Sequence, residues 1–267
     1  MICKYDLKKS IKISIIFEIL MILVLILGLI LYNSLIYKQD NIYTYLEDLP
    51  KFILRGLGIK EGKSYDFFYY YALLTNVVLI ISALFSNFLG FSLIFRDKKD
   101  DAIGFYLKKP IKRESIVKQK LLAGFIILFV SCFIYHLISS FLILILSNTA
   151  YNFRLLLYMN SSILLMEIVF FLIGMIVGLF LDKKRNFIIP SILTILSCEF
   201  IHIVSQAFNL TALKYINPFS YFNVLDIALT QKYQYRFIVI TTFLVLFLYN
   251  FIIGLFESIN KFQKTNC

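Results

Sequence analysis

The stretch ISIIFEILMILVLILGLILY, residues 13–32, decides the fold. Crossing a hydrocarbon core of ~30 Å takes about 20 helical residues, and this run supplies them with Glu18 as its one charged side chain. Because the run is long and lacks a small-residue cleavage site, it predicts a retained span and not a signal peptide. Glu18 lies near the beginning of the run, so we expect its carboxylate to reach the headgroups on that side.

Five further runs of comparable length follow along the chain. Since backbone groups cannot stay unpaired in lipid, each run predicts a helix. The expected fold is an all-α polytopic membrane protein with a single transmembrane domain over residues 1–267. The predicted spans are roughly 13–34, 70–95, 121–147, 156–181, 187–208 and 236–256.

The composition supports the same fold class. The 267 residues are 60% apolar and 16% charged, with a mean hydropathy of +0.82, whereas a soluble domain is roughly 45–50% apolar and about 25% charged. The four cysteines form no CxxC pair and no metal-ligand spacing. These features exclude a disordered chain, a disulfide scaffold, a secreted enzyme and a nucleic-acid-binding domain.

The net charge of +11 is therefore informative about which segments lie on which side of the membrane. Two thirds of the Lys and Arg residues fall in 1–12, 96–120, 182–186 and the tail after 256, all on one side of the predicted spans. The positive-inside rule places that side, and both termini, in the cytoplasm. High Ile, Lys, Asn, Phe and Tyr usage suggests an AT-rich bacterial genome, so we expect the bacterial cell membrane.

The segment RDKKDDAIGFYLKKPIKRESIVKQK, residues 96–120, lies on the cytoplasmic side. Asp100 or Asp101 can cap a short helix that presents Ile103, Tyr106 and Leu107. Pro110 ends that helix, and a second helix is expected to begin near Pro110–Arg113 and continue into the third span. One interpretation is an anchor on anionic lipid; the other is a docking helix for a cytosolic protein.

Here the sequence resembles the type-2 ABC permease family, small six-span subunits without an ATPase of their own. The residues that match the family pattern are Asp97, Asp100, Ile103, Leu107, Pro110, Ile111, Arg113, Ile116 and Lys120. The chain departs at Asp101-Ala102, where the family has Gly-Thr, and at Lys108 and Lys112, where it has Ser. A second match is Asn217-Pro218-Phe219-Ser220-Tyr221-Phe222 before the last span. The amphipathic residues 3–12 also fit, so the resemblance covers the whole chain.

The resemblance implies a permease domain that is not itself an enzyme. Segment 100–118 would dock on a separate ABC ATPase, which would carry ATP and Mg²⁺, so no cofactor is expected on this chain. A smaller contact would involve Asp182, Lys183, Lys184 and Arg185. The functional unit would contain a second permease chain, either an identical copy or a sister subunit. Family members often export amphipathic substrates, such as antimicrobial peptides, antibiotics or lipid-like molecules.

Two more features qualify this interpretation. Residues 56–64, GLGIKEGKS, approach a phosphate-binding loop, but Leu57 stands where its first Gly is required. Residues 209–235 are too apolar for a solvated loop and are broken at Asn217-Pro218, so we expect helices lying in or dipping into the outer leaflet.

Four ionisable residues are predicted near the membrane midplane, and we expect them to partner one another: His136, Glu167, Glu199 and His202. They could form interhelical hydrogen bonds, a polar transport path or a metal site. The last two leave an ATP-independent ion or proton carrier and an intramembrane metal-dependent enzyme as alternatives. Small-residue ridges, Ser82-Ser86-Gly90 and Gly174-Gly178, are expected to pack within the chain.

Overall fold

The computed structural model describes residues 2–37, 67–99, 113–146, 152–180 and 188–265. Within these ranges every regular element is a helix, and six helices are long and apolar enough to cross a membrane. Each overlaps one of the predicted spans, which confirms a multi-pass helical membrane protein. They are α1 (Ile2–Tyr37), α4 (Phe67–Lys99), α6 (Arg113–Leu146), α7 (Phe153–Phe180), α8 (Ile188–Ala207) and α12 (Tyr235–Thr265).

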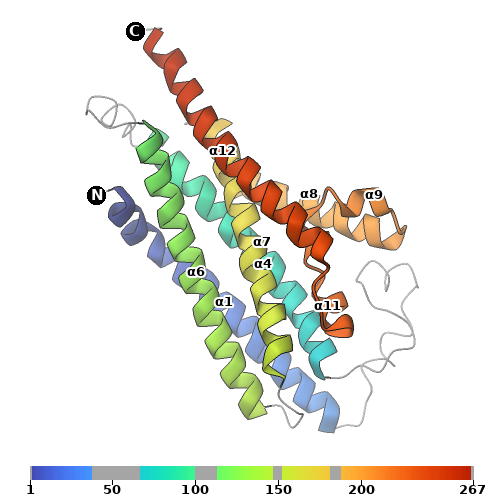
Figure 1. Cartoon of the computed structure of the whole chain (residues 1–267). Helices are drawn as coiled ribbons and strands as arrows, with labels where there is room; N and C mark the ends of the chain where they lie inside the picture. Colours follow the sequence, from blue (N-terminus) through green and yellow to red (C-terminus); the bar gives the residue numbers. More distant parts are fainter. Residues whose placement is uncertain (1, 38–66, 100–112, 147–151, 181–187, 266–267) are drawn as a thin grey trace.

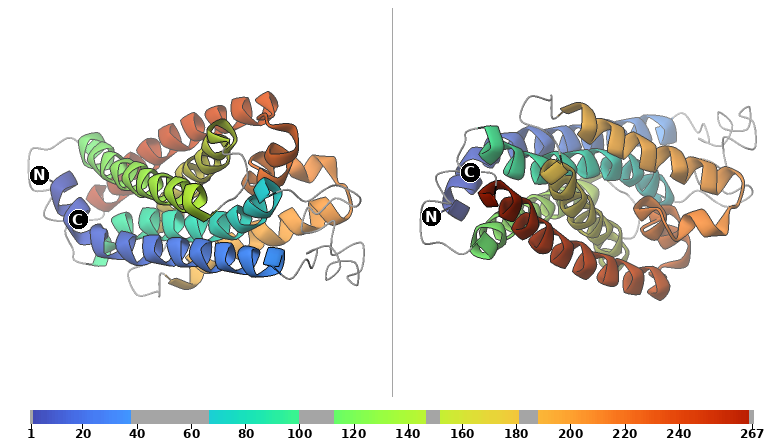
Figure 2. Two further views of the ribbon diagram at one scale, coloured as in Figure 1. Left: turned by 90° about the horizontal axis from the view of Figure 1, so that it is seen from below. Right: turned by 90° about the horizontal axis from the view of Figure 1, so that it is seen from above.

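The helices form one elongated bundle (Figures 1 and 2). The beginning of α1, the end of α4, the beginning of α6 and the end of α12 all lie at one end, which we call the terminal end. Helices α4 and α7 are the most buried, whereas α8 and α12 leave most of their apolar side chains on the outside. Apolar outer faces of this kind are what contact with lipid requires.

The closest packing is between α4 and α7, and two glycines permit it. A Cβ atom added to Gly90 would lie 2.1 Å from the Phe171 carbonyl oxygen, and one added to Gly174 would lie 2.1 Å from the Asn87 carbonyl oxygen. Any side chain at either position would therefore collide with the backbone of the partner helix. The glycines of the two predicted small-residue ridges, Gly90 on α4 and Gly174 and Gly178 on α7, each contact the partner helix within one chain, as expected for close helix packing in a membrane.

The beginning of α1 differs in detail from the expectation. Residues 3–12 continue into the first span without a break, as one helix of 36 residues. Within residues 3–12 the buried side chains are Asp6 and Ser10, spaced one turn apart. The amphipathic segment therefore turns a largely polar face, and not an apolar one, toward its neighbours in the bundle.

The expectation for Glu18 is wrong. Its side chain is buried between α1 and α6, where the Ser131 hydroxyl donates to Glu18 Oε2. A carboxylate can reach the headgroups only from the outer face of a helix, and Glu18 lies on the inner face. The sequence shows the depth of a residue along a span but not which neighbouring helix covers it.

The predicted broken segment is three short helices: α9 (Thr211–Lys214), α10 (Pro218–Tyr221) and α11 (Val224–Thr230). Asn217 caps α10 by accepting from the Phe219 amide, and Asn223 caps α11 in the same way. All four residues of α10 are buried. We expected helices lying in or dipping into the outer leaflet, and the burial of α10 makes this part of the segment an element of the protein core.

The α4–α7 contact predicts a pair of glycine variants with opposite outcomes. We expect Gly174→Ala to lower stability by about 1–3 kcal/mol, because the added methyl group overpacks the contact with Asn87. Gly254 has no atom within 4 Å of an added Cβ, so Gly254→Ala should leave stability unchanged or raise it slightly. Thermal unfolding in a mild detergent measures both variants. Equal stability of the two would contradict the assigned role of Gly174.

Candidate functional site

The predicted ATPase-docking residues lie largely outside the described ranges. This holds for Asp100, Asp101, Ile103, Tyr106, Leu107 and Pro110, and for the second contact Asp182, Lys183, Lys184 and Arg185. Arg113 is the first residue of α6. The structure does describe both helices that flank segment 100–112, and the way in which they are held can be followed atom by atom.

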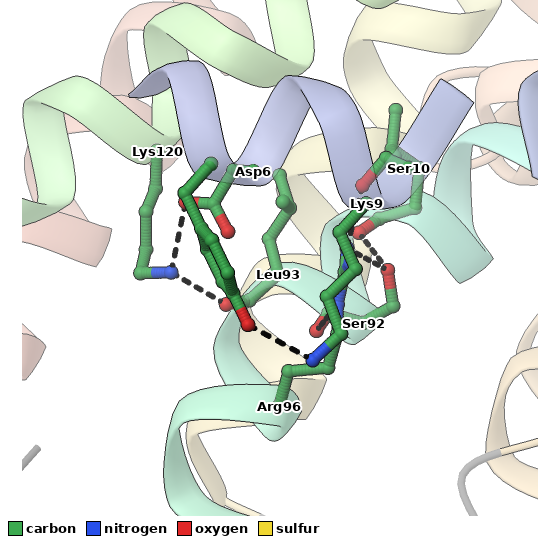
Figure 3. A network of polar contacts seen from close by, with 9 residues as sticks. Asp6, Lys9, Ser10, Ser92, Leu93, Arg96 and Lys120 are labelled. Atoms are coloured by element: carbon green, nitrogen blue, oxygen red, sulfur yellow. Dashed lines mark hydrogen bonds and ion pairs between the residues drawn. The ribbon is translucent and has the colours of Figure 1, made fainter. Parts of the chain in front are cut away.

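The beginning of α6 is fixed by Lys120, which is 1% exposed. Its Nζ donates to Asp6 Oδ2 of α1 at 3.1 Å and to the Leu93 carbonyl of α4 at 2.9 Å (Figure 3). Asp6 is equally hidden, at 2% exposed. A buried ion pair is tolerated only when its charges are paired and hydrogen-bonded, so this contact holds three helices in one register.

The end of α4 is fixed by Arg96. Its Nη2 donates to Ser10 Oγ of α1 at 2.6 Å and to Ser92 Oγ at 3.1 Å, and its Nε donates to the Ser92 carbonyl at 2.9 Å (Figure 3). Asp6 and Ser10 stand one helical turn apart, so the same face of α1 reaches both partners. We call these five residues the terminal clamp: Asp6, Ser10, Ser92, Arg96 and Lys120.

The sequence indicated only part of the terminal clamp. Lys120 stood out as a family match, but its function as the partner of Asp6 did not. Asp6 is the one acidic residue among the first 17 residues, where Lys4, Lys8 and Lys9 surround it. An isolated acid on the buried face of a basic amphipathic segment is the signal that could have indicated a partner inside the protein.

The four ionisable residues predicted near the membrane midplane do not come together in the structure. His136 is hydrogen-bonded to Asn160, whose Nδ2 donates to His136 Nδ1 at 2.9 Å and to Ser139 Oγ at 2.8 Å. The buried Tyr71 hydroxyl donates to Asn160 Oδ1 at 2.7 Å. Asn160 is therefore the centre of a network that joins α4, α6 and α7. Nothing in the sequence distinguished it from the other polar residues of its apolar run.

His202 belongs to a separate cluster. The Gln206 amide is hydrogen-bonded to His202 Nε2 at 2.9 Å, and His202 Nδ1 is hydrogen-bonded to Ser220 Oγ at 3.0 Å. Glu199, one turn earlier on α8, has a buried Oε2 without a hydrogen-bond partner. Glu167 is fully buried, and neither of its carboxyl oxygens has a partner. The expectation that the four residues pair with one another is wrong.

The outer segment docks on three helices through its predicted residues. Asn217 Nδ2 donates to the Cys198 carbonyl of α8 at 2.6 Å, and Phe219 packs on Phe170 of α7 with ring centroids 5.1 Å apart. Tyr221 stacks on Phe237 of α12 at 5.5 Å. Pro218 begins α10, where the missing N–H has no intrahelical partner to lose. The segment 217–221 thus contacts α7, α8 and α12 and joins these three helices.

These geometries restrict the chemistry that the described part of the chain could perform. It contains no group of three or more His, Cys, Asp and Glu side chains placed to hold a metal ion. Neither histidine is hydrogen-bonded to a glutamate of the described ranges. What the terminal clamp and the Asn160 network do provide is rigid linkage between spans.

The terminal clamp predicts a thermodynamic cycle. Lys120→Met should lower the free energy of unfolding by about 3–5 kcal/mol, since it leaves the Asp6 carboxylate buried without its cation. Adding Asp6→Asn removes that charge and should restore most of the loss. Lys118→Met is the matched control, because its pair with Glu114, at 2.5 Å, is half-exposed and contributes little. Unfolding by titration with SDS measures all three; a double variant no more stable than Lys120→Met would contradict the pairing.

The Asn160 network predicts a second stability effect. Asn160→Ala leaves Tyr71, His136 and Ser139 without their shared partner, so we expect a loss of about 1–3 kcal/mol. Asn250 makes one exposed hydrogen bond to the Leu246 carbonyl on its own helix. Asn250→Ala should therefore be nearly neutral in the same SDS titration. A neutral Asn160→Ala would show that the network does not stabilise the bundle.

The comparisons with known proteins identify no family for this chain. No family model matches the chain, and no curated protein matches it. The ABC permease resemblance thus rests on the sequence motifs. By its six apolar helices, the chain is a multi-pass helical membrane protein.

Proposed function

We propose that the chain is the membrane-spanning permease subunit of a bacterial ABC transporter. In this proposal a separate ATPase docks on segment 100–118, with Asp182–Arg185 as a smaller contact. ATP and Mg²⁺ are bound by that partner. A second permease chain, identical or a sister subunit, completes the transporter in the cell membrane, and both termini face the cytoplasm.

The observation that carries the proposal is the terminal clamp. It joins the last turns of α4 and the first turns of α6, the two helices that flank segment 100–112, to the beginning of α1. A push on that segment would move three helices together, because the buried Lys120–Asp6 pair cannot stretch without exposing two charges to an apolar interior. A segment that served only as a lipid anchor would have no need of this linkage.

The α4–α7 contact supports the same function at longer range. Backbone atoms meet directly at Gly90 and Gly174, so a displacement of the end of α4 would be passed to α7 with little side-chain adjustment. Movement could thus spread from the terminal end through the most buried pair of spans. This mechanical continuity is what a permease driven by a cytosolic ATPase requires.

The proposed substrate is an amphipathic molecule that is exported, such as an antimicrobial peptide, an antibiotic or a lipid-like compound. The support is chemical. The described outer faces of the spans are apolar, so a cargo that already partitions into the bilayer could approach through lipid.

Co-purification tests the proposal. The chain is extracted from its native membranes in a mild detergent, and proteins bound in stoichiometric amount are identified by mass spectrometry. We expect an ABC-type ATPase with the wild-type chain, and its loss from Leu107→Asp and from Arg113→Ala. Arg236→Ala is the matched control, since Arg236 is exposed in the first turn of α12, and the start of α12 lies away from the beginning of α6 (Figure 1).

Two outcomes would contradict the proposal. One is a wild-type chain that is purified without any ATPase. The other is an ATPase that remains bound to both docking variants as firmly as to Arg236→Ala. Either would favour the lipid-anchor interpretation of 96–120. Membrane insertion of each variant is checked by its yield in the membrane fraction and by its elution as a single species.

A further inference from the structure

An open groove runs along α6 where this helix meets α12, outside the terminal clamp and the Asn160 network. Its larger part has a volume of about 640 Å³, within the range of roughly 300–1,000 Å³ that is typical of sites for small molecules. Tyr249 lines this part from α12. The opposite wall consists of apolar side chains of α6, which include Leu122, Phe125, Ile126 and Phe129.

The groove has a polar end. A smaller hollow of about 270 Å³ adjoins the larger one at the beginning of α6, and Lys118 and Leu122 line both. Glu114, Ser115 and Gln119 also line the smaller hollow. We call the two hollows together the α6–α12 groove. Because the beginning of α6 lies at the terminal end of the bundle (Figure 1), the groove is charged at that end and apolar toward the middle of the spans.

The length of the apolar part matches one leaflet of a bilayer. Lys118 and Val130, which line its two ends, are 12 positions apart, or about 18 Å along a helix. Half of a hydrocarbon core of ~30 Å is ~15 Å. When the apolar part lies among the acyl chains of one leaflet, Lys118 is therefore at the level of the headgroups.

The charge at the polar end suits a phosphate group. Lys118 is paired with Glu114 at 2.5 Å, but both side chains are about half-exposed, and such a pair contributes little. The Lys118 ammonium can therefore turn to another anion without a large loss of stability. The stretch KKPIKRESIVKQK, residues 108–120, has six basic residues and one acidic residue, and clustered basic side chains at a membrane surface attract anionic lipid headgroups.

We propose that the α6–α12 groove binds one glycerophospholipid. Its phosphate lies at Lys118, and an acyl chain lies along the exposed side chains of Leu122, Ile126 and Phe129. A phospholipid is the occupant that combines an anionic head with an apolar tail one leaflet long, which is the order of polarity along the groove. The inference goes beyond the proposed transport function and needs no ATPase.

Native mass spectrometry of the full-length protein tests the site. The protein is purified in a maltoside detergent, freed of lipid and titrated with dioleoylphosphatidylglycerol. We expect one lipid to bind more tightly than those that follow. Lys118→Met should weaken this first binding roughly fivefold, the effect of one Lys near a membrane surface. Ile126→Trp should abolish it, because the larger side chain fills the apolar part of the groove.

Two matched controls should bind the first lipid like the wild type. Lys8→Met removes an exposed Lys of α1, and Leu137→Trp enlarges an exposed side chain of α6 beyond the groove. A second ligand, dioleoylglycerol, has the same chains without a phosphate. It should therefore bind equally to the wild type and to Lys118→Met. Circular dichroism and size-exclusion profiles show whether each variant folds.

Several results would overturn the proposal. One is a wild-type protein whose first lipid binds no more tightly than the next, and another is unchanged binding in both groove variants. Equal losses in Leu137→Trp and Ile126→Trp would indicate lipid spread over the outer surface. A dimer that is lost from Ile126→Trp while lipid binding stays unchanged would assign the groove to a second permease chain. Since no ATPase is present, none of these results depends on the co-purification experiment.

Discussion

Two backbone carbonyls, those of Asn87 and Phe171, occupy the space where Gly174 and Gly90 would otherwise carry side chains. Lipid offers no hydrophobic drive for helices to associate, so close van der Waals contact of this kind is a main source of stability in a membrane bundle. Helices α4 and α7 form the central pair because of it, and α1, α6, α8 and α12 are arranged around them. The packed helices then hold the buried polar side chains in fixed positions, where they can form hydrogen bonds with one another.

Polar side chains in the interior have separate tasks according to their place in the bundle. At the terminal end, the terminal clamp pairs the buried charges of Asp6 and Lys120 and joins the helices that flank segment 100–112. In the middle, Asn160 satisfies neutral groups from three helices. Glu18 of α1 accepts a hydrogen bond from Ser131, whereas neither carboxyl oxygen of the fully buried Glu167 has a hydrogen-bond partner among the described residues.

A feature of this fold could be predicted where a short stretch of sequence determines it, and could not where it depends on a contact between residues far apart in the chain. The spans were predicted from their length and hydropathy alone, and each one overlaps a helix, because membrane thickness fixes both quantities. The ridge of Gly90 and the broken segment at Pro218 are also local signals. Partners of single polar residues are not local: Asp6 and Lys120 are separated by 114 positions, and neither position identifies the other. The burial of Glu18 was mispredicted for the same reason, since it depends on which face α6 covers.

The separation of Asp6 from Lys120 has a consequence for the order in which the protein is made. At ~5–20 residues per second, the ribosome would need roughly 6–23 seconds to travel between these two codons. During that interval α1 and α4 are synthesised, while Lys120, the cation that pairs with Asp6, has not yet been made. Burial of the Asp6 charge in the bundle therefore has to follow synthesis of the first turns of α6. Closure of the terminal clamp would then mark the moment when the first half of the bundle becomes a single unit.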